Sequence, residues 1–228
     1  MVTISDMNFS KFFSEQARKP SGIFGQVVMS AVFDIGNAFL NNFVSELLSV
    51  QSGDHVLDIG CGTGKLISNL SSQVNEGYFE GVDYSNKMVS KALKKNKKNI
   101  KIGKVKIIEG NFDQMPFKNS SFNKVSSVNT LYFWPQPEFT ALKISNILKP
   151  GGLLVVAFED IKQLEQRNLN KDIFHLYTAD EVIDLLAKSG FSTDITLISK
   201  SKSNQVFHCV VAKTKHNPVQ VTARARRV

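Results

Sequence analysis

Three glycines fall within five residues at Gly60, Gly62 and Gly64, and an acidic residue, Asp83, follows nineteen residues after the last of them. A chain that omits side chains at such short intervals lets its backbone come close to another group. The glycines follow one short apolar run, and Asp83 ends the next. In a doubly wound sheet this pairing places backbone beneath a nucleoside and a carboxylate on its ribose hydroxyls. These residues therefore predict a nucleoside-binding site.

The elements that would position these residues alternate between strand and helix, with short connections. Strands are expected at residues 55–59, 78–82, 105–109, 124–128, 153–158, 192–199 and 205–213, and helices at 65–74, 86–97, 137–148 and 178–188. Ser85 is expected to cap the helix over 86–97, and residues 149–152 to separate a helix from the fifth strand. The predicted fold class is α/β, a doubly wound, seven-stranded, mostly parallel sheet with helices on both faces.

The chain divides into three predicted regions. Residues 1–50 are expected to form an N-terminal helical lid, residues 51–214 the ligand-binding domain, and residues 215–228 a basic, flexible tail. In the lid, Phe13 and Arg18 are candidates to face the ligand. The alternative is that Phe13 packs against the sheet and that Arg18 is solvated.

The spacing of the glycines disfavours a dinucleotide, because the loop G-x-G-x-x-G would need a glycine where Lys65 stands. The pattern Asp58-x-Gly60-x-Gly62-x-Gly64 resembles motif I of the class I S-adenosylmethionine-dependent methyltransferases. Residues 109–112 with 115–117, 121–125 and 148–152 resemble that family's third-, fourth- and fifth-strand motifs, in the same order. The resemblance spans about residues 50–213. It is closest to the small-molecule group that includes the quinone-biosynthesis C-methyltransferases.

This resemblance implies a Rossmann-like fold that binds S-adenosylmethionine and releases S-adenosylhomocysteine. Asp58 would order the glycine loop and bind the ammonium group of the cofactor, and Asp83 would accept hydrogen bonds from both ribose hydroxyls. An ordinary loop-capping role is the alternative for both acids. Asn111 stands where the family more often has Asp, but its amide oxygen can still accept from the adenine amino group. The implied cofactor residues are Asp58, Gly60, Cys61, Gly62, Gly64, Asp83, Tyr84, Met88, Asn111, Phe112 and Asn129.

Fewer sequence features indicate which residues would bind the methyl acceptor. His175 and Tyr132 are the candidate catalytic residues, with Glu159 and Asp160 as further candidates for a base. His175 has the alternative role of positioning a helix. The candidate acceptor-binding residues are Phe13, Arg18, Tyr132, Trp134 and Tyr177, although Tyr132 and Trp134 could instead pack against the following helix.

No pattern points to a metal or to nucleobase chemistry. The Asn/Asp-Pro-Pro-aromatic motif of nucleic-acid amino-methyltransferases is missing, no Pro-Cys pair occurs, and no acid lies between Lys124 and Gln136 to complete a carboxylate cluster. We therefore predict metal-independent transfer, by direct displacement, to a small molecule that is aromatic or has an apolar tail. An RNA-directed methyltransferase and a non-catalytic S-adenosylmethionine-binding regulatory protein are the alternatives.

The net charge of +8 is unevenly distributed. Nine lysines lie within residues 87–106 and five basic residues within 213–228, with no acid in either stretch; without these 14 charges the net charge becomes −6. We interpret them as a solvated helix face and a basic tail, so nucleic acid is not the expected partner. The two cysteines form no disulfide framework, and neither a signal peptide nor a membrane-spanning stretch is recognisable. We expect a cytoplasmic monomer or homodimer without stable membrane insertion.

Overall fold

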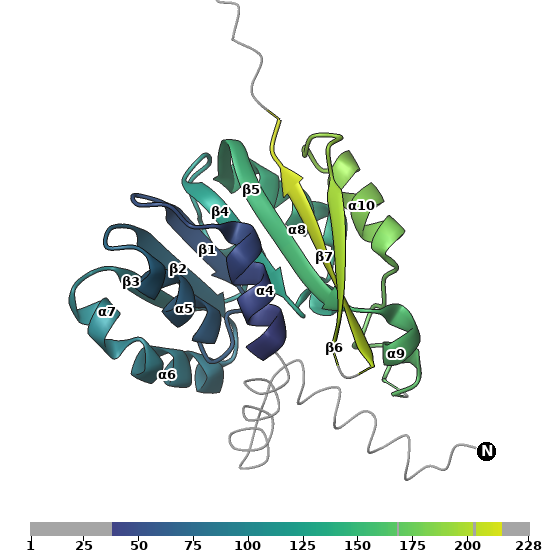
Figure 1. The fold of residues 1–228 in the computed structure, drawn as a ribbon, viewed down its shortest axis with the longest axis horizontal. Helices are drawn as coiled ribbons and strands as arrows, with labels where there is room; N and C mark the ends of the chain where they lie inside the picture. The colour runs from purple at the N-terminus through teal and green to yellow at the C-terminus, as the bar shows by residue number, and fades with distance from the viewer. Residues whose placement is uncertain (1–37, 168, 203, 216–228) are drawn as a thin grey trace, which may run out of the picture.

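The structure is a computed structural model that describes residues 38–167, 169–202 and 204–215. A seven-stranded sheet in the order β3-β2-β1-β4-β5-β7-β6 runs through its centre (Figure 1). The strands are β1 (His55–Ile59), β2 (Tyr78–Asp83), β3 (Val105–Glu109), β4 (Phe122–Val128), β5 (Leu148–Glu159), β6 (Thr196–Lys202) and β7 (Gln205–Lys213). Strands β1 to β5 pair in parallel, and β7 is antiparallel to both β5 and β6. The predicted doubly wound, mostly parallel sheet is confirmed.

Helices cover both faces of the sheet (Figure 1). On one face, α4 (Ala38–Leu48) and α5 (Lys65–Gln73) share an apolar core with β1 and β2. On the other, α8 (Pro137–Ile147) and α10 (Ala179–Lys188) share a core with β4 and β5. The remaining elements are α6 (Asn86–Lys95), α7 (Lys97–Lys101), α9 (Ile161–Glu165) and the 3-10 turns η2 (Phe112–Gln114) and η3 (Leu131–Phe133). Each main helix buries apolar residues three or four apart, as Leu66 and Leu70 do in α5.

The helix expected over residues 86–97 divides at Asn96. The buried Asn96 side chain donates to the carbonyl oxygens of Gly64 (3.1 Å) and Ala92 (3.0 Å), which fixes the end of α6 against the glycine loop. At the other end of α6, Ser85 occupies the cap position as expected, but its side chain forms no capping hydrogen bond. The Asp83 carboxylate accepts from the Ser85 backbone N–H instead (2.9 Å).

Several strand boundaries also differ from the prediction, two of them by four or five residues. Residues 149–152 do not separate a helix from a strand; they belong to β5, which begins at Leu148 directly after α8. Leu148 pairs with Phe122 and Leu153 pairs with Lys124, so the extra residues form an irregularity in the ladder. Strand β6 begins at Thr196 rather than at residue 192, because residues 193–195 form a tight turn.

Most of the expected N-terminal lid, including Phe13 and Arg18, lies outside the described residues, as does the tail beyond residue 215. The described part of that region is α4, which packs against α5 and the sheet with Leu40, Val44 and Leu48 fully buried. No helix within the described ranges is both long enough and apolar enough to span a bilayer.

Candidate active site

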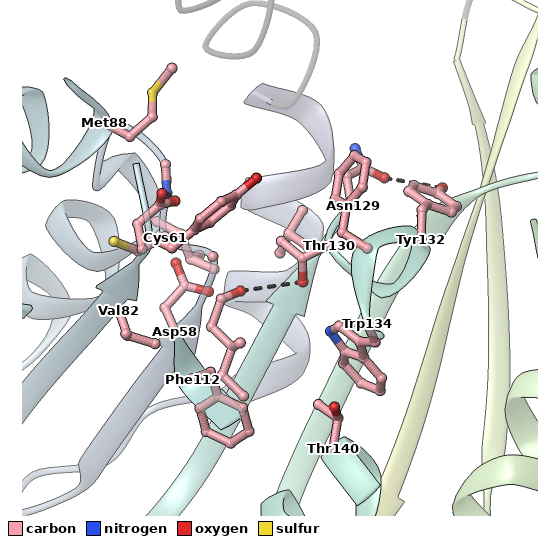
Figure 2. A pocket seen from close by; sticks show the side chains of 18 of the residues that line it. Asp58, Cys61, Val82, Met88, Phe112, Asn129, Thr130, Tyr132, Trp134 and Thr140 are labelled. Atoms are coloured by element: carbon pink, nitrogen blue, oxygen red, sulfur yellow. Dashed lines mark hydrogen bonds between the residues drawn. The ribbon is translucent and has the colours of Figure 1, made fainter. Parts of the chain in front are cut away.

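A cavity of about 610 Å³ opens at the carboxyl ends of the parallel strands, where the strand order reverses between β1 and β4. Open α/β sheets bind ligands at this position. Figure 2 shows Asp58, Cys61 and Met88 on one side of the cavity and Tyr132 and Trp134 on the other. Thirteen residues predicted from the sequence line it: Asp58, Gly60, Cys61, Gly62, Asp83, Tyr84, Met88, Asn111, Phe112, Asn129, Tyr132, Trp134 and Glu159.

The three glycines of the loop between β1 and α5 have different structural roles. Gly60 has φ +70°, and a Cβ there would lie 2.2 Å from Cγ2 of Thr130, so this glycine permits close packing against the loop after β4. Gly62 has φ +54°, and a Cβ there would meet nothing within 4 Å. Gly64 does not line the cavity; a Cβ there would lie 2.6 Å from Nδ2 of Asn96. Gly62 is therefore the glycine whose missing side chain leaves space for a ligand.

Asp83 ends β2 and organises both neighbouring segments. One carboxylate oxygen accepts from the Gly62 backbone N–H (2.9 Å), and the other accepts from the Ser85 backbone N–H (2.9 Å). Burial raises the pKa of Asp83, while these two hydrogen bonds oppose the shift. Because a carboxylate oxygen can accept more than one hydrogen bond, the side chain retains acceptor capacity toward the cavity.

Asp58 lies deeper, near the end of β1, and is only 3% exposed. One of its carboxylate oxygens accepts from the Ser126 hydroxyl on β4 (2.8 Å). Burial raises the pKa of Asp58 to about 7; the Ser126 hydrogen bond opposes this shift and the charge of Asp83 adds to it. A cationic group in the cavity would favour the ionised form.

The loop after β3 lines the cavity through residues 110–113. The Asn111 side-chain oxygen accepts from the Asp113 N–H (3.1 Å), which begins η2. From α8, the Lys143 ammonium donates to the carbonyl oxygens of Phe112 (2.7 Å), Asp113 (2.9 Å) and Met115 (2.7 Å). Burial lowers the pKa of Lys143, and the charge of Asp113 opposes this shift. Lys143 therefore holds the backbone of this loop in place with three hydrogen bonds.

The opposite side of the cavity is mainly apolar. We call these residues the apolar wall: Tyr132, Phe133, Trp134, Leu164, Leu169 and Phe174. Phe133 and Phe174 pack edge to face with ring centroids 4.7 Å apart. Arg167 and Glu159 also line the cavity and form a two-pronged ion pair with N–O distances of 3.2 and 2.5 Å.

The Tyr132 hydroxyl is held between two partners. It accepts from the Glu159 N–H (2.7 Å) and donates to the Asn129 side-chain oxygen (3.5 Å; Figure 2). Burial strongly raises the pKa of Tyr132. The hydroxyl is therefore protonated at neutral pH and does not supply a base. Cys61 is also buried, and burial raises the pKa of its thiol well above the ordinary value, so it is not a thiolate nucleophile.

Three residues predicted for the acceptor side do not line the cavity: Asp160, His175 and Tyr177. His175 is exposed, and its backbone N–H donates to the Tyr132 carbonyl oxygen (3.0 Å), while the adjacent Phe174 is buried in the apolar wall. The cavity is also lined by residues that no sequence pattern indicated: Asn41, Leu164, Arg167, Leu169 and Gln205. They lie on α4, in or just after α9, and on β7, without a local motif. Among the described residues no group of three His, Cys, Asp or Glu side chains could hold a metal ion.

A methyltransferase-domain family model matches residues 50–190. The fold and the site thus define a class I S-adenosylmethionine-dependent methyltransferase. The chain belongs to the methyltransferase-domain family, and its methyl donor is S-adenosylmethionine.

Two relatives and one solved structure illustrate the range of this family. The chain is 27% identical over 124 residues to the O-methyltransferase rstn1 of Aspergillus nomiae, covering 54% of this chain and 55% of the relative. It is 31% identical over 109 residues to the demethylmenaquinone methyltransferase of Oceanobacillus iheyensis, covering 47% and 45%. The chain therefore spans about half the length of each relative. A Haloferax volcanii protein solved with the Trm112 methyltransferase activator has the same fold, with a TM-score of 0.72, 18% identity, and coverage of 90% and 99%.

Two observations indicate that an adenosyl amino acid would fit the cavity. Burial holds the pKa of Asp58 near neutrality, a cost that the ammonium group of the cofactor would offset. The open space at Gly62 lies beside the Asp83 carboxylate, which suits a ribose that approaches the loop backbone.

Proposed function

We propose that this enzyme methylates a small acceptor that is aromatic or has an apolar tail, by direct displacement and without a metal. The main support is that one cavity is lined both by the glycine loop and by the apolar wall. An acceptor on the apolar wall would therefore be close to a cofactor on the loop. The relatives support the same substrate class, because one is named an O-methyltransferase and another a demethylmenaquinone methyltransferase.

In this proposal the strand ends bind the cofactor. Asp83 accepts hydrogen bonds from the ribose hydroxyls, and Asp58 pairs with the ammonium group, directly or through water. Tyr84 and Met88 flank the adenine, and Asn111 lies at its edge. All five residues line the cavity, which supports these roles.

The bound cofactor supplies a methyl group that its sulfonium charge has already activated. The protein's part is to hold the acceptor in line with that group and to exclude water. The apolar wall would exclude water and orient the acceptor. Where the acceptor must lose a proton, Glu159 is favoured over Asp160 as the base, because Glu159 lines the cavity and Asp160 does not.

The test is methyl transfer to 2-naphthol, 1,4-dihydroxynaphthalene and catechol, with S-adenosylhomocysteine and methylated product measured by mass spectrometry. We expect acceptor-dependent product that is lost in Asp83→Ala. Lys98→Ala is the matched control, because Lys98 is exposed on α7 and does not line the cavity. Cofactor binding without transfer to any of these acceptors would contradict the proposed substrate class.

The lysines of residues 87–106 favour RNA as the second candidate acceptor, since many of them lie exposed along α6 and α7. Methylation of total RNA that weakens steeply with added salt, and that falls in Lys98→Ala, would support this alternative. RNA methylation that is absent at every salt concentration would exclude total RNA as the substrate.

A further inference from the structure

Trp134 is the single tryptophan of the chain and follows η3 directly. Its side chain belongs to the apolar wall and is 5% exposed. The indole nitrogen is buried and has no hydrogen-bond partner within the described part of the chain. A buried N–H without a partner is uncommon in folded proteins and calls for a specific explanation.

The polar side chains beside Trp134 use their hydrogen bonds elsewhere. The Thr140 hydroxyl donates to a carboxylate oxygen of Asp113 (2.9 Å), and the Thr130 hydroxyl pairs with that of Ser127 (2.5 Å). Figure 2 shows the nitrogen-bearing edge of the indole turned toward the interior of the site, on the side of Phe112. The protein thus points a hydrogen-bond donor, rather than a purely apolar edge, at this part of the site.

An indole N–H can only donate, so its partner must be a hydrogen-bond acceptor such as an oxygen. A site that contains a buried donor discriminates against ligands that leave the donor unpaired. Tyr132 and Phe133, which directly precede Trp134, belong to the apolar wall, whereas all the predicted cofactor residues except Asn129 lie in or after β1, β2 and β3. The methyl acceptor is therefore a better partner for the N–H than the cofactor is.

We propose that the Trp134 indole N–H donates a hydrogen bond to an oxygen of the methyl acceptor and so selects oxygen-bearing ring compounds over hydrocarbons of the same shape. This inference rests on the proposed function. It narrows the acceptor to phenols, quinols or ketones whose oxygen reaches Trp134 when the ring lies on the apolar wall. Since the nitrogen is buried, the indole shifts slightly as the acceptor enters.

The experiment uses the indole N–H as its own reporter. In ¹⁵N-labelled protein saturated with S-adenosylhomocysteine, the single tryptophan gives one indole N–H signal. The protein is titrated with 1-tetralone and with tetralin, which share a ring skeleton but differ in one ketone oxygen. We expect 1-tetralone to move the indole proton signal downfield, and tetralin to leave it near its starting position.

The matched variant is Trp134→Phe, which keeps an aromatic ring but removes the N–H. We expect the ratio of the tetralin and 1-tetralone dissociation constants to be about tenfold larger in the wild type than in Trp134→Phe, equivalent to about 1.4 kcal/mol. Unchanged binding of S-adenosylhomocysteine by Trp134→Phe would show that the cofactor half is intact. If the variant does not fold, the shift of the wild-type indole signal still decides the question.

Three results would overturn the inference. The first is a downfield shift on S-adenosylhomocysteine alone, which would assign the N–H to the cofactor. The second is an equal response to tetralin and 1-tetralone, and the third is an unchanged ratio in Trp134→Phe. Failure of the proposed function has a different signature, because the protein would then not transfer methyl groups to any small acceptor, whatever the indole signal does.

Discussion

We expect the affinity for S-adenosylhomocysteine to fall as the pH is lowered from 7.0 to 5.5. The reason is the buried Asp58 carboxyl, whose pKa burial raises to about 7 in the ligand-free protein. The proposed partner of Asp58 is the ammonium group of the ligand, which pairs with the ionised carboxylate. Binding below pH 7 must therefore remove a proton from Asp58, and the free energy of that step weakens the complex.

The size of the effect follows from the ionised fraction of Asp58. With a pKa of about 7, half of the carboxyl groups are ionised at pH 7.0 and about 3% at pH 5.5, so the affinity falls about 16-fold. The same linkage predicts release of about 0.9 protons per ligand bound at pH 6.0. The α-amino group of the ligand remains largely protonated over this range, so it does not obscure the effect.

Isothermal titration calorimetry in two buffers of different ionisation enthalpy measures both quantities. The control is Asp58→Asn, which preserves the shape of the side chain but cannot ionise. In this variant we expect weaker binding at pH 7.0 and no dependence on pH between 5.5 and 7.0. A wild-type affinity that is constant over this range, with no proton release, would refute the pairing of Asp58 with the ammonium group.

The same raised pKa affects the stability of the ligand-free protein. Because the pKa of Asp58 is higher in the folded state than the ordinary value of 3.8, the stability it confers is greatest below pH 3.8 and is lost as the pH rises through 7. The shift corresponds to about 4 kcal/mol. We therefore expect Asp58→Asn to raise the melting temperature of the ligand-free protein at pH 8, although it weakens cofactor binding.

Four further perturbations test other parts of the site. Gly60→Ala would place a Cβ 2.2 Å from Cγ2 of Thr130, so we expect a loss of about 3 kcal/mol in the free energy of unfolding, partly restored by Thr130→Ser, as measured by chemical denaturation. Gly62→Ala meets no atom within 4 Å, so it costs only about 1 kcal/mol of backbone strain but weakens cofactor binding; equal effects of the two substitutions on stability would contradict this distinction. Asp83→Ala removes a hydrogen-bonded carboxylate, and we expect a loss of about 3 kcal/mol in cofactor binding by calorimetry; wild-type affinity would disprove the ribose assignment. Lys143→Met removes three hydrogen bonds to the loop after β3, and we expect about tenfold weaker cofactor binding, largely restored by Lys143→Arg; a loss of thermal stability with unchanged affinity would mean that Lys143 only supports the fold.

The fold was largely predictable because its signals are local. Each buried strand is a short apolar run, and each connection carries turn or capping residues, as at Thr178 and Glu181, whose capping box begins α10. The boundaries that differed depend on contacts between distant segments. Asn96 ends α6 because it reaches the Gly64 carbonyl oxygen, and Leu148 joins β5 because it pairs with Phe122. Neither contact leaves a mark in the neighbouring sequence.

The residues of the site also fall into a group that the local sequence indicates and a group that it does not. The cavity residues at the ends of β1, β2 and β3 follow from a sequence motif, because one glycine loop and one acid are enough to indicate where backbone meets ligand. The apolar wall does not follow from a motif, because Leu164, Leu169 and Phe174 are ordinary apolar residues until the chain folds back over the sheet. Beside the candidate base His175, which is exposed, Phe174 is buried in the wall, and no pattern in the sequence distinguishes the two positions.

Helix α8 links the two halves of the cavity. Trp134, on the apolar wall, lies three residues before the start of α8, and Lys143 within α8 holds the loop after β3 with three hydrogen bonds. A fourth hydrogen bond, from the Thr140 hydroxyl to Asp113, joins the same helix to the same loop. A movement of α8 would therefore alter the positions of the loop after β3 and of the apolar wall together. Substitutions at the carboxyl ends of β1 and β2 are expected to change the affinity for the cofactor alone. Substitutions in α8 should change the affinities for both cofactor and acceptor.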